Sequence, residues 1–174
     1  KARRSLVLAR DRFGIKPLFF VHKDGQFGFA SEVRPLVDSG LASRKISARA
    51  LDDYFTYGSV QQPRTIYEDI IALMPASYIE LDVDTLKHTS GKYYDYLAEV
   101  SQKELASLPY EDAVRLVREK LEEATRYHLV ADVEVGAFLS GGIDSSAVVA
   151  LMARYASKPI KTYSVGFPRP MEVE

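Results

Sequence analysis

Residues 140–146 read Ser-Gly-Gly-Ile-Asp-Ser-Ser, a combination of residue types suited to binding phosphate. Gly141 and Gly142 let the backbone approach an anion closely and adopt conformations closed to other residues, and the three serines add hydroxyl donors. An apolar run before the segment predicts a strand, and the residues after it predict a helix. The first N–H groups of a helix lack intrahelical partners, and its dipole favours an anion there. The segment therefore predicts a phosphate cradle.

Asp144 places a negative charge beside the expected phosphate, which is unfavourable unless a cation lies between them. Mg²⁺ bridging the carboxylate and the phosphate oxygens would resolve the conflict, so Asp144 is the candidate metal ligand. No Gly-Lys-Ser/Thr string occurs in the chain, which points away from the nucleotide-binding loop of γ-phosphate transfer. A Ser/Asp helix cap after a glycine turn is the alternative, purely structural interpretation.

The elements expected around this loop form a strand–helix–strand unit. Residues 133–139 and 161–167 predict strands, and residues 145–155 predict the helix between them. That order is typical of a parallel sheet. A long amphipathic helix is expected earlier, over residues 110–128, with Glu122 among the charged residues that face water. Its expected apolar face comprises Ala113, Val117, Leu121 and Ala124.

The first half of the chain predicts antiparallel structure instead. Strands are expected over residues 5–10, 17–22, 27–30, 76–81 and 92–96, and helices over residues 31–40 and 47–57. The first three strands are expected to form one small sheet, with an Asp-Gly hairpin turn between the second and third. Tyr93, Tyr94 and Tyr96 are interpreted as sheet packing. Residues 98–108 lose apolar periodicity and are the expected linker.

Bulk composition limits the class of protein. The chain has 174 residues, of which 47% are hydrophobic and 27% charged, a globular balance. A net charge of -1 gives no basic footprint for nucleic acid, and no apolar run approaches the roughly 20 residues of a membrane helix. Cysteine is absent, which excludes disulfides and thiolate sites within these residues and fits a cytoplasmic protein. Because the first residue is Lys1, we expect a piece of a longer protein.

The loop and its flanks carry a resemblance to a known family. Residues 140–146 match the signature of the ATP pyrophosphatase (PP-loop) superfamily, and residues 135–146 closely resemble glutamine-hydrolysing asparagine synthetases. The resemblance implies that the loop holds the pyrophosphate part of ATP and that Asp144 helps bind Mg²⁺. It also implies that Leu139 and Val165 lie against the nucleoside, largely through their backbone. The candidate ATP-binding residues are Leu139, Ser140, Gly141, Gly142, Asp144, Ser145, Ser146 and Val165.

The first half resembles the same family. Residues 10–20 and 29–32 are similar to the late part of its glutaminase domain, and residues 63–67 and 74–78 to its closing strands. The family more often has Gly or Pro near Ala76. Four charged residues of these strings are interpreted as forming fold-holding salt links and turn contacts rather than acting in catalysis. They are Arg10, Asp11, Lys16 and Glu32.

The resemblance implies an α/β (α+β) fold in two parts. Residues 1–97 would be the C-terminal part of a glutamine amidotransferase domain of the N-terminal-nucleophile type, with layered antiparallel sheets. Residues 98–108 would be a linker. Residues 109–174 would be the N-terminal part of a parallel-sheet synthetase domain.

The implied activity is glutamine-dependent asparagine synthesis by a carbon–nitrogen ligase. Ammonia is released from glutamine, ATP adenylates the side-chain carboxylate of aspartate with release of pyrophosphate, and ammonia then displaces AMP. The partners would be these small molecules, with neither nucleic acid nor membrane, and a homodimer is kept open. The catalytic cysteine is expected upstream of Lys1, so we expect these residues alone to be inactive.

Two alternatives stay open. A related amidotransferase could act on another acceptor, in sugar or polysaccharide modification or in β-lactam formation. A non-catalytic homologue could retain the fold for binding or assembly. The intact loop disfavours the second alternative, because a dead site has no need for Asp144 and two adjacent glycines.

Overall fold

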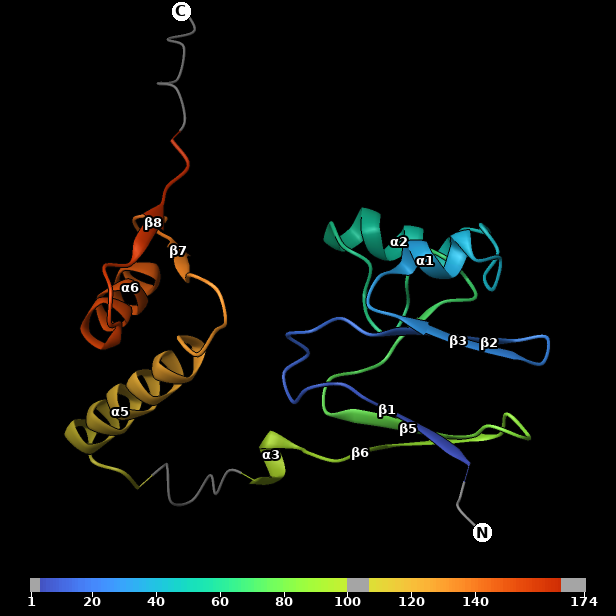
Figure 1. Cartoon of the computed structure of the whole chain (residues 1–174), viewed down its shortest axis with the longest axis horizontal. Helices are drawn as coiled ribbons and strands as arrows, with labels where there is room; N and C mark the ends of the chain where they lie inside the picture. The colour runs from blue at the N-terminus through green and yellow to red at the C-terminus, as the bar shows by residue number, and fades with distance from the viewer. Residues whose placement is uncertain (1–3, 100–106, 167–174) are drawn as a thin grey trace, which may run out of the picture. The chain divides into compact units, whose positions relative to one another are not determined.

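The computed structural model describes residues 4–99 and 107–166, which fall into two compact units, Lys1–Val100 and Ser101–Glu174 (Figure 1). The first unit contains β1 (Ser5–Ala9), β2 (Phe19–Lys23), β3 (Gln26–Ala30), α1 (Val33–Asp38), α2 (Ala48–Tyr57), β4 (Ile71–Ala72), β5 (Ser77–Asp82), β6 (His88–Lys92) and α3 (Tyr96–Glu99). The second contains α5 (Tyr110–His128), β7 (Gly136–Phe138), α6 (Ile143–Tyr155) and β8 (Lys161–Tyr163). Most of the expected linker, residues 100–106, lies outside the described residues.

Two antiparallel sheets form the frame of the first unit, in the orders β1-β5-β6 and β3-β2-β4. The predicted hairpin between β2 and β3 is confirmed, and its turn has positive φ at Asp24 and Gly25. The prediction that the first three strands share one sheet is wrong. β1 pairs with β5, with Ser5 opposite Asp82 and Ala9 opposite Tyr78. Strand patterns give the face of a strand but not its distant partner, so this pairing could not be predicted locally.

β2 lies between two hydrophobic clusters. Val21 is 1% exposed and packs with Leu36 of α1, whereas Phe20 packs with Leu8 of β1 and Ile79 of β5. Successive strand side chains point to opposite faces, and each fully buried one of this kind contributes about 1.5–3 kcal/mol. In Figure 1, α1 and α2 lie on one side of β2 and β3, and β1 and β5 on the other. The unit is therefore layered as helix, sheet and sheet.

Arg10 joins the loop after β1 to the residue that follows β4. Its side chain is buried, and its guanidinium donates to the carbonyl oxygens of Leu73 (2.7 Å), Lys16 (2.9 Å) and Gly14 (3.0 Å). Asp11 accepts the backbone N–H groups of Phe13, Ile15 and Lys16. The turn contacts predicted for Arg10 and Asp11 are therefore confirmed. Glu32, by contrast, precedes α1 without a side-chain capping bond.

The strand expected over residues 92–96 is wrong in position. β6 ends at Lys92, and Tyr96 begins the short α3. Tyr93 donates its hydroxyl to the backbone oxygen of Arg10 at 2.6 Å, and Tyr94 lies under the guanidinium of Arg12. These tyrosines therefore hold the loops after β6 and β1 rather than pack on the sheet.

Ala76 adopts a left-handed backbone with φ of 57°. An L-residue with a side chain is disfavoured there, and glycine carries no such penalty. Of the two residues that the resembling family more often has near this position, glycine would adopt this conformation without penalty, whereas proline has a fixed negative φ. Ala76 is also buried, at 6% exposed, directly before β5.

The second unit contains the predicted strand–helix–strand order, and β7 pairs with β8 in parallel, Gly136 opposite Lys161. β7 is shorter than the predicted strand over residues 133–139. Glu122 does not simply face water, as predicted; it accepts a hydrogen bond from Tyr155 of α6. In the part of the chain that the structure describes, no helix is both long and apolar enough to cross a membrane.

Candidate functional site

The loop at residues 139–142 connects β7 to α6 at the carboxyl end of the parallel strand pair. The Leu139 N–H donates to the Tyr163 oxygen at 2.8 Å and extends the ladder by one bond beyond Phe138. Gly141 then turns the chain with φ of 82°, a left-handed conformation that favours glycine. Ligands of open parallel sheets bind at this carboxyl end. The loop is thus in the position that an anion cradle requires.

Gly142 is the N-cap of α6, with an extended backbone and no side-chain capping bond. α6 begins at Ile143. The N–H groups of its first turn, which lack intrahelical partners, therefore belong to the loop residues for which the sequence predicts an anion site. A Cβ added at Gly141 would meet nothing within 4 Å, and one added at Gly142 would meet only Ser140 Oγ at 3.5 Å. The space over both glycines is therefore open to a ligand.

The three serines form a hydrogen-bonded group inside the loop. Ser140 Oγ and Ser145 Oγ lie 2.9 Å apart. Ser145 and Ser146 donate their hydroxyls to the Gly142 oxygen at 3.1 and 2.8 Å. The prediction that these hydroxyls donate to a ligand stays a prediction, and in the structure they bond within the loop. They hold the turn closed around Gly142, and each can rotate to a ligand.

Asp144 lies in the first turn of α6 with an exposed side chain. Its carboxylate has no hydrogen bond or ion pair with another described residue. Among the described residues no group of three or more His, Cys, Asp or Glu could hold a metal ion. A Mg²⁺ at Asp144 would therefore take its remaining ligands from phosphate oxygens and water, which is its usual preference in nucleotide sites. The residues present fit that arrangement.

Leu139 directly follows β7, and Val165 follows β8 after Ser164; their nucleoside role stays a prediction. Val165 is 75% exposed and Leu139 is half-buried. Ser164, to which the sequence analysis gave no role, donates its hydroxyl to the Leu139 oxygen at 2.7 Å. No local signal identifies Ser164, because its role depends on the register between β7 and β8.

α5 contacts α6, the helix that follows the loop, through polar side chains. Tyr155 in the last turn of α6 donates to Glu122 at 2.6 Å, and Arg154 lies 3.3 Å from the same carboxylate. The pKa of Tyr155 is raised, first by this hydrogen bond to Glu122 and then by desolvation. The guanidinium of Arg126 lies 5.5 Å from the Tyr155 ring, within cation–π range.

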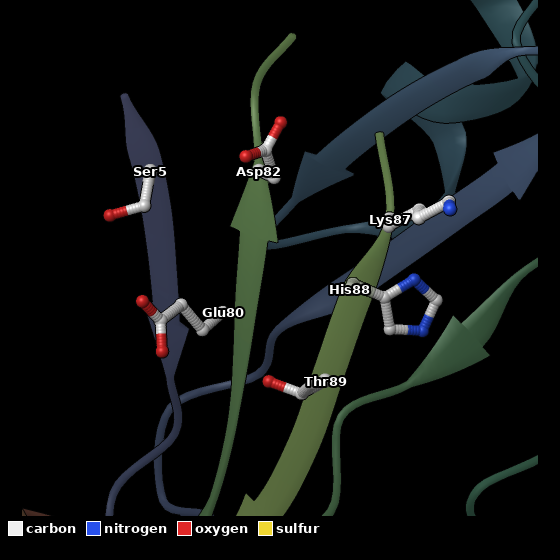
Figure 2. A pocket seen from close by; sticks show the side chains of 6 residues that line it. All are labelled: Ser5, Glu80, Asp82, Lys87, His88 and Thr89. Atoms are coloured by element: carbon white, nitrogen blue, oxygen red, sulfur yellow. The ribbon is translucent and has the colours of Figure 1, made fainter. Parts of the chain in front are cut away.

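Apart from the loop, a concavity of about 170 Å³ lined by polar side chains lies in the first unit, on the β1-β5-β6 sheet. Figure 2 shows that its side chains come from all three strands. Its lining residues are Ser5, Glu80, Asp82, Lys87, His88 and Thr89. Asp82 accepts from the N–H groups of Asp84 and Thr85 and so holds the turn before β6. None of the predicted site residues lines this concavity.

Two family models match separate parts of the chain. Residues 1–94 match the family model described as glutamine amidotransferase domain, and residues 116–174 match the one described as asparagine synthase. The chain is 32% identical over 170 residues to asparagine synthetase [glutamine-hydrolyzing] 3 of Bacillus subtilis, covering 95% of the chain and 26% of that protein.

Two further relatives show the range of names. Asparagine synthetase [glutamine-hydrolyzing] 1 of Bacillus subtilis is 35% identical over 159 residues, covering 91% of the chain and 24% of that protein. Amidase chry2 of Gibberella zeae is 31% identical over 160 residues, covering 91% and 23%. The chain thus spans about a quarter of the length of these relatives. With both family models matched in this order, the chain belongs to the glutamine-hydrolysing asparagine synthetase family.

Proposed function

We propose that the protein carrying this chain is a carbon–nitrogen ligase that makes asparagine, with glutamine as the ammonia donor and ATP as the activating substrate. Residues 1–97 would belong to its glutamine amidotransferase domain and residues 109–174 to its ATP pyrophosphatase domain. The observation that carries the proposal is the loop after β7. It combines left-handed Gly141, open space over Gly142 and, at the start of α6, an Asp144 without a partner among the described residues, within the residues that match asparagine synthase.

The loop's work in this proposal is positioning and electrostatic stabilisation. A carboxylate oxygen of the acceptor attacks the α-phosphorus of ATP, and the bond to the pyrophosphate oxygen breaks. The N–H groups at the start of α6 lie where negative charge then builds on the leaving pyrophosphate. Asp144 would hold Mg²⁺, which neutralises phosphate charge when bound. Ammonia next attacks the acyl carbon, and AMP leaves with the electron pair of the acyl–oxygen bond.

Two structural requirements follow for this chain's own residues. The backbone at Gly141 must keep its left-handed turn, because the turn directs the α6 N–H groups toward the ligand. Ser140, Ser145 and Ser146 must exchange their contacts within the loop for phosphate oxygens, which hydroxyl rotation allows. Leu139 and Val165 would then hold the nucleoside beside the loop.

The test is pyrophosphate release by the intact protein, supplied with ATP, Mg²⁺, glutamine and a panel of carboxylic acids. The proposal expects release that requires aspartate and is matched by asparagine formation. Release with a different acid and none with aspartate would instead support the alternative acceptor. The similarity to amidase chry2 is the observation that keeps that alternative. Absence of release with every acid would overturn the adenylation step itself.

A further inference from the structure

Ser164 interrupts the hydrogen-bond ladder between β7 and β8 at the point where the candidate nucleotide site begins. In a parallel pair, a residue that donates to one neighbour accepts from the residue two positions further along that strand. Leu139 donates to the Tyr163 oxygen at 2.8 Å, so its carbonyl would next accept from the Val165 N–H. The structure instead has the Ser164 hydroxyl on the Leu139 carbonyl, at 2.7 Å.

Because the Ser164 hydroxyl takes the place of the next ladder bond, the Val165 backbone is not part of the ladder. Neither its N–H nor its carbonyl has a hydrogen bond with another described residue, and the side chain is 75% exposed. Backbone N–H groups without a partner in the fold are ready donors for a ligand. Here the unpaired group lies at the carboxyl end of β8, beside the loop that starts at Leu139.

We propose that Ser164 is a positioning residue for the nucleoside part of the ligand. Its hydroxyl bonds the Leu139 carbonyl where the next ladder bond would form, and the strand ends there with the Val165 N–H available to an acceptor on the nucleoside. The pyrophosphate part, held by residues 140–146, does not depend on this contact. The inference rests on the proposed function, because it assigns a role within the same nucleotide site.

The experiment compares binding of two ligands to the intact protein by titration calorimetry, AMP for the nucleoside side and Mg²⁺-pyrophosphate for the loop. Ser164→Ala removes the hydroxyl, Ser164→Thr retains it, and Thr162→Ala is the matched control on exposed β8. We expect Ser164→Ala to weaken AMP binding about 3- to 10-fold, the effect of one hydrogen bond, and to leave pyrophosphate binding unchanged. Ser164→Thr should restore AMP binding, and Thr162→Ala should bind both ligands like the parent.

A second readout follows the Val165 amide directly. Hydrogen exchange monitored by NMR should show this amide exchanging more slowly in Ser164→Ala than in the parent, because it can then donate to the Leu139 carbonyl. A purely structural Ser164 would lower thermal stability and weaken both ligands alike, which would overturn the positioning role. Equal AMP affinity in the parent and in Ser164→Ala would also overturn it.

The failure of this inference is distinct from failure of the proposed function. If the parent protein binds neither AMP nor pyrophosphate, the proposed nucleotide site fails and the role of Ser164 fails with it. If the parent binds both and Ser164→Ala binds AMP equally well, only the role of Ser164 is lost.

Discussion

The hydroxyl of Tyr155 donates a 2.6 Å hydrogen bond to the carboxylate of Glu122 and ties the last turn of α6 to α5. The opposite end of α6 begins directly after the candidate phosphate loop. This polar contact at the far end of α6 therefore helps to hold the helix, and with it the first-turn N–H groups, in position against α5. Buried side chains contribute little to holding the helix, because among the described residues of this unit only Thr125 and Met152 are buried.

We expect Tyr155→Phe to remove this tie and to reduce the stability of the second unit at neutral pH. The folded-state pKa of Tyr155 is raised above its ordinary value of 10.0, so the contact stabilises the fold fully below pH 10. That stability is lost as the pH rises through the raised pKa. Thermal unfolding of the intact protein between pH 8 and 11 measures it. Tyr155→Phe should flatten the alkaline fall, and a parent-like fall in the variant would contradict the assignment.

In the first unit, Asp69 makes stability depend on pH in the acidic range, as Tyr155 does in the alkaline range. Its pKa is lowered from 3.8 to about 2, first by the Ser43 hydroxyl at 2.6 Å, then by the Ser43 N–H and the Lys23 ammonium. A depressed carboxyl pKa stabilises the fold above about pH 4, and this stability is lost as the pH falls toward 2. Asp69→Asn should therefore cost on the order of 1–2 kcal/mol at pH 7 and less at pH 2.

Chemical denaturation across that pH range measures the effect of Asp69. Asp38→Asn is the matched control, because the Asp38 pair with Arg44 is long, at 3.4 Å, and exposed. Exposed pairs of this kind contribute about 0–1 kcal/mol. An equal change for both variants would contradict the special role of Asp69.

The two loop glycines should respond differently to alanine. Gly141 has φ of 82°, where a Cβ costs about 1–2 kcal/mol, so Gly141→Ala should reduce stability and pyrophosphate affinity together. Gly142 has φ of -76° and an ordinary contact with Ser140 Oγ at 3.5 Å. Gly142→Ala should fold like the parent yet bind pyrophosphate more weakly, because its methyl group enters the space over the loop. Parent-like binding by Gly142→Ala would remove that residue from the cradle.

Asp144→Asn should separate metal binding from folding. The side chain is exposed and unpaired among the described residues, so thermal stability should not change. Turnover with ATP and Mg²⁺ should fall about 100-fold or more, because metal stabilisation of phosphate charge is worth several kcal/mol. Asp132→Asn carries the same charge change in the same unit and should behave like the parent. Equal turnover in Asp144→Asn and the parent would remove Asp144 from the metal role.

The sequence allowed the local elements to be predicted because their signals are local. The helix over residues 110–128 and the hairpin after β2 agree with the structure, since periodicity and an Asp-Gly turn act within a few residues. The pairing of β1 with β5 and the contact of Glu122 with Tyr155 could not be predicted. Both depend on segments far apart in the chain, for which one sequence carries no pairing signal.

The same distinction applies to the candidate site. Residue types within residues 140–146 were enough to predict an anion cradle with a cation ligand, because each contribution comes from a neighbour in sequence. The internal bonds of the loop serines and the role of Ser164 depend on the turn geometry and strand register instead. The chemistry assigned to these side chains stays a prediction from the sequence, whereas their hydrogen-bond partners could be identified only in the structure.

The alternation along β2 has a consequence for how the chain can change in length. Phe20 faces one cluster and Val21 the other. Inserting or deleting one residue within this strand would exchange the two sets of side chains and disturb both clusters at once. The neighbouring turn at Asp24 and Gly25 is exposed, so a change of length there disturbs neither cluster. Insertions and deletions among homologues should therefore be found at that turn and be absent from β2.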